Sequence, residues 1–278
     1  MKVAIVAGPP ARWHEVGDQA AAEHYGTRLA SALSACGDDV TLYVRRTISE
    51  GAVSANGVDS VRSVLVPAGP VSDLPQRETL PLMGEFAQYL NTAWLADRPD
   101  VVHAHAWLPG LAAALAAGRH GIPTVQSFHG LAAASDCNGE ASRRRLEILL
   151  AKSATWVIAG STDEMTTLAG MRRSRARMSV VGGAVDIEQF APMAIGTHGG
   201  YGRRIVGLAA GTGPGCGLDV VIHALSKLRG LELVGAITQP SRERPDALRR
   251  LAVEAGVADR VTFVEACLLY TSPSPRDS

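Results

Sequence analysis

The side chains of this chain that could carry chemistry include histidines placed where strands are expected to end. His103 and His105 lie at the end of the apolar segment 100–104, and His129 directly follows the segment 124–128. Alternation along a strand puts His103 and His105 on one face, where they could bind a metal as a pair. No third ligand stands at a convincing spacing, so hydrogen-bonded packing under the next helix is the favoured interpretation. His129, beside a glycine, is placed to touch a ligand, because a neutral imidazole can donate or accept a hydrogen bond.

Charged and loop residues are weaker candidates. The segment 142–147 opens an expected helix with three arginines, which could hold a phosphate at the helix N-terminus or form a solvated face. The loop 8–18 is either a substrate loop or an ordinary surface connection. It lacks the GxGxxG pattern, which argues against an NAD enzyme. The chain also has no GxSxG elbow, P-loop, HExxH or DxD pattern.

An alternation of strands and helices must position these residues. Short continuous apolar runs predict buried strands, and helical periodicity with stop signals predicts the helices between them. Strands are expected at 3–7, 40–44, 61–66, 100–104, 124–128, 155–159, 178–181, 205–209, 231–236 and 260–264. Helices are expected at 20–36, 82–97, 108–119, 139–153, 162–170, 218–229 and 245–256. The alternation predicts an α/β fold with parallel sheets, whose ligands bind outside the carboxyl ends of the strands.

Composition limits the class of protein. Lys+Arg and Asp+Glu are balanced at 27 each, so no global field attracts nucleic acid. Four scattered cysteines indicate a reducing cytosol and give neither a disulfide framework nor a zinc site. No apolar run is long enough for a membrane helix. We therefore expect a cytoplasmic protein without cofactor, metal or nucleic-acid partner.

Two stretches of the sequence suggest where the domains end. The glycine-rich segment 193–203 predicts a linker between a first domain, 1–192, and a second, 204–266. The run CLLYTSPSPRD at 267–277 resembles the translation of a transposase sequencing adapter. We therefore expect the tail 267–278 to be non-native and the natural sequence to be interrupted near Ala266, within the second domain.

Taken in order, several segments resemble a family-4 retaining glycosyltransferase of the GT-B fold. Each motif is only moderately specific, and their order and spacing carry the resemblance over nearly the whole of 1–266. The matching segments are LASALSACGDDV at 29–40, DVVHAHAW at 100–107, GIPTVQSFH at 121–129, the RxxE pattern at 144–147, AGS at 159–161, VD at 185–186 with FAP at 190–192, GLDVVIHAL at 217–225 and AGVADRVTF at 255–263.

The resemblance implies two Rossmann-like domains and metal-independent transfer of a sugar with retention at the anomeric carbon. A nucleoside-diphosphate sugar would be bound mainly by the second domain, and a small-molecule, glycan or lipid acceptor by the first, with a cleft between them. The resemblance makes His129 the catalytic residue against the donor sugar and Arg144 a grip for a phosphorylated acceptor. It adds Tyr25, His105 and Ser161 as substrate-binding residues. It also allows a location peripheral to the membrane.

Departures from the family pattern keep other functions open. Ala20 and Ala21 stand where the family has a glycine pair. In the diphosphate loop, Gly211 and Cys216, before Gly217, stand where the family has an arginine and a lysine. In the family these two cations stabilise the negative charge that develops on the leaving diphosphate. Losing one comparable interaction typically costs roughly 2.7–4 kcal/mol of transition-state stabilisation. The glutamate-rich segment of the family is also absent. We therefore expect this chain to be inactive. The alternatives are a degenerate, non-catalytic binding protein and a nucleotide-sugar epimerase, although the epimerase should carry catalytic carboxylates that are not seen.

Overall fold

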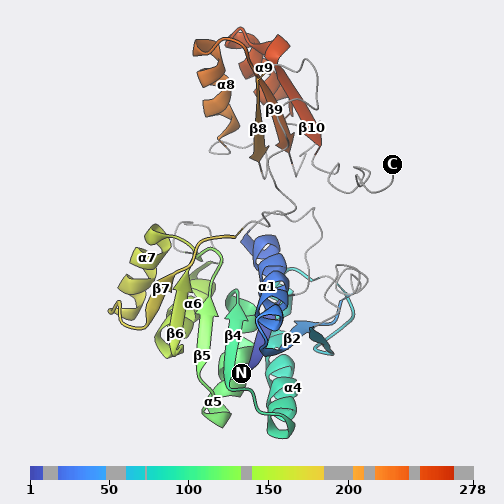
Figure 1. Cartoon of the computed structure of the whole chain (residues 1–278), viewed down its shortest axis with the longest axis vertical. Coiled ribbons are helices and arrows are strands. Elements are labelled where there is room, and N and C mark those ends of the chain that lie inside the picture. Colours follow the sequence, from blue (N-terminus) through green and yellow to red (C-terminus); the bar gives the residue numbers. More distant parts are fainter. Residues whose placement is uncertain are drawn as a thin grey trace. The chain divides into compact units, whose positions relative to one another are not determined.

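The computed structural model describes residues 1–8, 18–47, 61–72, 74–132, 140–184, 203–209, 217–237 and 245–265. Its contacts divide the chain into two compact units (Figure 1). The described part of the first unit ends at Ala184, and that of the second begins at Arg203. Each unit is a parallel sheet with helices, as the alternation of strands and helices predicts.

The first unit is built on a seven-stranded parallel sheet in the order β3-β2-β1-β4-β5-β6-β7. The chain therefore starts in the middle of the sheet, adds strands on one side, and then crosses back to add the rest on the other. The strands are β1 (Lys2–Ala7), β2 (Asp39–Arg45), β3 (Arg62–Val66), β4 (Val101–His105), β5 (Thr124–Ser127), β6 (Trp156–Ala159) and β7 (Met178–Val180). This order makes β4 and β5 neighbours, which brings the histidine-bearing strand ends together.

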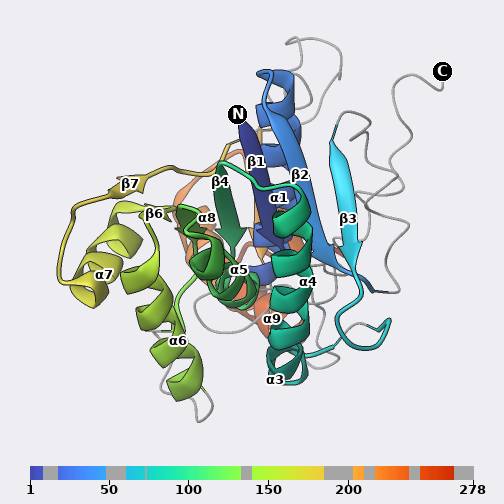
Figure 2. The same cartoon turned by 90° about the horizontal axis from the view of Figure 1, so that it is seen from below.

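The helices of the first unit lie on both faces of its sheet (Figure 2). On one face of the sheet, the side chains of Ala4, Val6, Val102 and Ala104 pack against α4, α5, α6 and α7. On the other face, Val3, Ile5 and Ala7 pack against α1. The helices are α1 (Asp18–Ala35), α3 (Gln76–Thr79), the 3₁₀ turn η2 (Leu80–Leu82), α4 (Met83–Ala96), α5 (Trp107–His120), α6 (Glu140–Ser153) and α7 (Thr162–Arg172).

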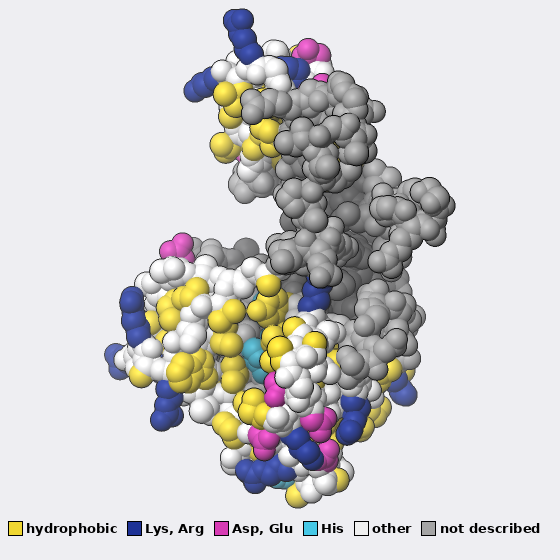
Figure 3. All heavy atoms as spheres, in the orientation of Figure 1, with side chains coloured by type: hydrophobic (Ala, Val, Ile, Leu, Met, Phe, Trp, Pro, Cys, Tyr) yellow, Lys and Arg dark blue, Asp and Glu magenta, His cyan; other side chains and the backbone are white. Residues whose placement is uncertain are grey.

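The face that carries α1 is only partly covered among the described residues. The register pairs Val125 with Trp156 and Ser127 with Ile158, so these side chains continue the face of His103 and His105. Trp156 is 41% exposed. Hydrophobic side chains gather over β5, β6 and β7 in the space-filling view (Figure 3). A parallel sheet is normally buried on both faces, so this side of the first unit is unusual in the described part of the chain.

The second unit is a three-stranded parallel sheet in the order β10-β9-β8, packed against two helices. Its strands are β8 (Arg203–Ala209), β9 (Leu231–Ile237) and β10 (Val261–Glu265). Its helices are α8 (Leu218–Lys227), α9 (Pro245–Glu254) and the 3₁₀ turn η4 (Ala258–Arg260). A methyl group on Gly207 would lie 2.8 Å from a Leu218 methyl, so this glycine lets α8 approach the sheet closely.

The strands and helices agree with those predicted from the sequence, to within a few residues at their ends. The exceptions are α3 with η2, and η4, which were not predicted because none of them is long enough to show a period. Among the described helices, none is both long and apolar enough to cross a bilayer. The predicted linker 193–203 and tail 267–278 lie outside the described residues, apart from Arg203, which begins β8.

Candidate functional site

The histidines predicted from the sequence meet at the carboxyl ends of β4 and β5. His103 Nε2 and Ser127 Oγ are joined by a hydrogen bond of 3.0 Å. His105 Nδ1 and His129 Nε2 are joined by another of 2.9 Å. The ring centroids of His103 and His105 lie 4.2 Å apart, and those of His105 and His129 lie 5.2 Å apart. We call His103, His105, Ser127 and His129 the histidine cluster.

Helix α1 covers this cluster and adds Tyr25 to it. The Tyr25 ring centroid lies 5.7 Å from that of His105 and 5.4 Å from that of His129. An added Cβ on Gly26 would lie 3.1 Å from Ala7 Cβ and 3.6 Å from His105 Cδ2, so the helix runs close to the sheet here. Three of the predicted site residues, Tyr25, His105 and His129, are thus brought into contact.

The helix that covers the pair differs from the one expected. His103 and His105 were predicted to pack under the next helix, which is α5. Instead His103 pairs with Ile5 in the register, on the face that α1 covers. The helix α5 packs against the opposite face, with Val102 and Ala104. The expected alternation was right, but the crossover connections decide which helix lies on which face.

Burial keeps two of the imidazoles neutral. His105 is fully buried and His103 is 9% exposed. Burial, with a smaller contribution from His129, lowers the pKa of His103 from 6.5 to about 4. Burial, with contributions from His103 and His129, holds the pKa of His105 well below its usual value. Near neutral pH both rings are therefore uncharged, and each offers one donor and one acceptor nitrogen.

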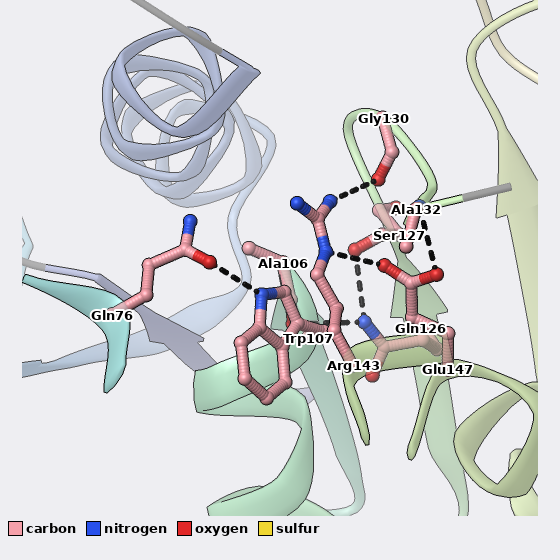
Figure 4. A network of polar contacts seen from close by, with 9 residues as sticks. All are labelled: Gln76, Ala106, Trp107, Gln126, Ser127, Gly130, Ala132, Arg143 and Glu147. Atoms are coloured by element: carbon pink, nitrogen blue, oxygen red, sulfur yellow. Dashed lines mark hydrogen bonds and ion pairs between the residues drawn. The ribbon is translucent and has the colours of Figure 1, made fainter. Parts of the chain in front are cut away.

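The backbone is strained where both strands end. Ala106 has φ 66° and ψ 168°, a region that residues other than glycine rarely adopt. His129 has φ 56°. Gln126 Nε2 donates to the carbonyl oxygens of Ala106 at 3.1 Å and Ser127 at 2.9 Å (Figure 4). Trp107, the first residue of α5, donates from Nε1 to Gln76 Oε1 at 3.3 Å. Buried hydrogen bonds therefore hold the turn after β4 in its strained form.

An ion pair on α6 holds the loop after β5. Arg143 Nε donates to Glu147 Oε1 at 2.8 Å, and Arg143 Nη2 donates to the Gly130 carbonyl at 3.1 Å (Figure 4). Glu147 Oε2 accepts the Ala132 N–H at 3.0 Å. Because Glu147 is fully buried, removing Arg143 would leave a buried charge without this partner, a change that typically costs about 3–5 kcal/mol. The pair fixes the loop that begins with His129.

The sequence interpretation missed this role of Arg143. The RxxE resemblance singled out Arg144 and Glu147 and gave Arg143 no role, whereas in the structure Glu147 pairs with Arg143, four residues earlier. The i, i+4 spacing of arginine and glutamate on a helix was the available signal. Arg144 itself is exposed on α6, as is Arg145.

Ser161 lies at the start of α7. Its Oγ accepts the Glu164 N–H at 3.1 Å, while Glu164 Oε2 accepts the Gly160 N–H at 2.6 Å. The arrangement resembles a capping box, except that the Glu164 carboxylate accepts from Gly160, one residue before the N-cap Ser161. Ser161 is exposed, and its hydroxyl proton is not used by the cap. Among the described residues, no hydrogen bond joins Ser161 or Arg144 to the histidine cluster.

In the second unit, only one residue of the predicted diphosphate loop is described. Gly217 precedes α8 with φ 83°, and Gly211 and Cys216 lie outside the described residues. Within the described ranges, no group of three or more His, Cys, Asp or Glu side chains is placed to hold a metal ion.

Comparisons with known proteins bear on both units. Residues 21–184 match the model of the glycosyl transferase 4-like domain. The D-inositol 3-phosphate glycosyltransferase of Mycobacterium marinum is 30% identical over 268 residues, which cover 89% of this chain and 57% of that protein. The chain thus spans little more than half the length of this relative.

Solved structures share the fold at low identity. Sucrose-phosphate synthase from Thermosynechococcus elongatus superposes with a TM-score of 0.64 at 17% identity, covering 95% of this chain and 70% of that one. Anabaena HepE in complex with UDP gives 0.64 at 15% identity, covering 95% and 69%. The expected GT-B fold is confirmed by these likenesses and by the parallel sheets of the two units.

Proposed function

The chain belongs to the glycosyl transferase 4-like family, and on that premise we propose that it serves the transfer of a sugar, with retention, from a nucleoside diphosphate to an acceptor. The observation that carries the proposal is the placement of His129. It lies two residues after the end of β5, at the sheet edge where parallel folds bind ligands, and the buried side chain of His105 is hydrogen-bonded to it. In this role His129 contacts the donor sugar, and the second unit with Gly217 binds the nucleotide.

The proposed acceptor is a phosphorylated polyol. The relative from Mycobacterium marinum is named for D-inositol 3-phosphate. In this chain, Arg144 is exposed on α6, whose Arg143 and Glu147 hold the loop after His129. An arginine can bind a phosphate with two parallel hydrogen bonds. We assign Arg144 to the acceptor phosphate, and Tyr25 and Ser161 to further contacts with the substrate. We also propose that the protein is cytoplasmic.

The acceptor assignment is tested by calorimetry with D-inositol 3-phosphate and with inositol. We expect binding that depends on the phosphate and weakens about tenfold or more in Arg144→Gln, because a hydrogen bond to a charged group contributes about 1.5–3 kcal/mol. Arg145→Gln is the matched control, since it removes the same charge from the neighbouring exposed position. Equal weakening in both variants would reduce the effect to general charge and reject the assignment.

Turnover is tested separately with labelled UDP-, GDP- and ADP-sugars. We expect no acceptor-dependent nucleotide release from this chain, because Gly211 and Cys216 replace the two cations of the family loop. Multiple turnover would contradict the proposed inactivity and support the transfer itself.

A binding protein is the second candidate, and the same two positions favour it. Gly211 and Cys216 remove the charges that would stabilise the leaving diphosphate. A protein that kept the fold but lost catalysis would bind an acceptor or a nucleotide sugar without turnover. The two candidates differ in what restoring both cations should do: nucleotide binding tightens if the loop meets a diphosphate, and it stays unchanged if the protein has another ligand.

A further inference from the structure

We propose that His105 is a positioning residue, which orients the imidazole of His129 and fixes its proton on Nδ1. The proposal rests on the proposed function in one respect, that His129 is the residue that meets the sugar. In this proposal His105 does not contact the substrate itself, as the family resemblance implied, but acts through His129. The carrying observation is the 2.9 Å hydrogen bond between His105 Nδ1 and His129 Nε2.

The surroundings hold the His105 ring in one orientation. Its side chain is fully buried, and the His103 ring lies against it with centroids 4.2 Å apart. The bond from His103 to Ser127 fixes that neighbour in turn. On the other side, the Tyr25 ring centroid lies 5.7 Å from that of His105, and α1 passes close to the ring at Gly26. A rigid ring can impose its hydrogen-bonding direction on a residue that begins a loop.

The tautomer follows from the two nitrogens of His105. A hydrogen bond between neutral imidazoles needs one N–H and one lone pair. His105 Nε2 is buried and has no hydrogen-bond partner among the described residues. A proton there would be a buried orphan donor, which is rarer in proteins than an orphan acceptor. The proton of His105 therefore lies on Nδ1 and is donated to His129 Nε2.

The consequence for His129 is a defined chemical role. Because its Nε2 accepts from His105, its own proton lies on Nδ1. The ring then presents a donor, rather than a lone pair, on the side that His105 does not occupy. A donor is what a sugar hydroxyl oxygen, or an oxygen that gains negative charge during transfer, requires.

The first test is nitrogen NMR of the intact chain labelled with ¹⁵N-histidine, with His129 assigned through His129→Asn. Asparagine tolerates the positive φ at this position. We expect His129 to be a single tautomer protonated on Nδ1, with a coupling across the hydrogen bond to His105 Nδ1. Protonation on Nε2, or no coupling, overturns the proposal, and this result does not require any change to His105. Neither result depends on glycosyl transfer, so the proposed function stands or falls by its own assays.

Two variants of similar chemistry sharpen the test. In His105→Asn, the side-chain amide reaches the former position of Nδ1 and can still donate to His129. In His105→Gln, the amide reaches the former position of Nε2 and cannot. We expect the asparagine variant to keep the His129 tautomer and the glutamine variant to show a mixture. An unchanged tautomer in both variants would reject the role of His105. His120→Gln, on α5 and outside the cluster, is the control for the loss of one histidine.

Once turnover has been obtained with the cations restored, the same variants predict a pattern of rates. His105→Gln should lower kcat about 10- to 100-fold, by analogy with the loss found when the hydrogen-bonded partner of a metal-ligating histidine is removed. His129→Asn should cause a smaller loss in the His105→Gln background than in the wild type, because the two residues act as one unit. Additive losses would mean that His105 acts independently of His129.

Discussion

At the scale of single residues, the histidine cluster couples charge to stability. His103 is buried as a neutral ring, and its pKa in the folded protein is about 4, against 6.5 for the ordinary side chain. Between these values the unfolded chain binds a proton that the folded chain does not. The free energy of unfolding is therefore fully retained above pH 6.5 and falls as the pH is lowered toward 4.

The loss attributable to His103 is expected to reach about 3 kcal/mol over that range. His105 adds to it in the same direction, because its pKa is also lowered by burial. Urea unfolding at a series of pH values measures the slope. His103→Gln removes one titrating group and should flatten the slope while His105 preserves part of it. The same slope in the variant and the wild type would show that His103 is not buried as a neutral ring.

At the scale of elements, the turn from β4 into α5 is held in a strained form. Ala106 occupies a backbone region that costs about 1–3 kcal/mol for a residue other than glycine. Glycine at position 106 should remove this cost. Ala104, buried in β4 with no positive φ, offers a matched comparison.

We expect the free energy of unfolding of Ala106→Gly to be at least about 1 kcal/mol higher than that of Ala104→Gly. Both substitutions raise the entropy of the unfolded chain, but only the first relieves strain in the folded state. Chemical denaturation of the two variants gives this difference directly. Equal destabilisation would mean that Ala106 is not strained in solution.

The start of α7 allows the structural and binding roles of Ser161 to be separated. Ser161→Ala should cost about 1 kcal/mol of stability, because the Glu164 N–H loses its acceptor. Ser161→Asp keeps an acceptor at the cap and should preserve stability. If Ser161 also binds the sugar acceptor substrate, both variants should weaken the binding of D-inositol 3-phosphate in calorimetry. Weaker binding confined to the less stable alanine variant would assign Ser161 to the cap alone.

At the scale of the whole molecule, the first unit carries the better-preserved family features, and the second departs from them at the diphosphate loop. Gly211→Arg with Cys216→Lys restores both cations ahead of Gly217 and α8, where helix amides also favour an anion. Calorimetry with UDP, GDP and ADP should show affinity increased by about 1–3 kcal/mol, as expected if charge-assisted hydrogen bonds form.

A control for net charge is available in the same unit. Val220 and Val253 are each 67% exposed, so Val220→Arg with Val253→Lys adds the same two charges on α8 and α9. This variant should leave the affinities unchanged. If the restored loop binds all three nucleotides no better than the control, the loop does not contact the diphosphate, and the binding-protein alternative gains support.

The sequence by itself determined the strands, the helices and the fold class. A run such as residues 3–7 is apolar throughout because a parallel strand is buried on both faces, and that signal is local. The same local pattern placed His129 at a strand end and predicted that His103 and His105 share a face. The motifs that carry the family resemblance are likewise short and continuous.

Only the tertiary structure decided which of these residues touch. His105 and His129 are 24 positions apart, and their contact depends on β4 and β5 being neighbours in register. The cover by α1 and the strain at Ala106 depend likewise on how separate elements pack. Local periodicity sets where an element begins and which way its side chains alternate. Strand order, register and the face that each helix covers arise from burial summed over the whole unit, so no single segment specifies them.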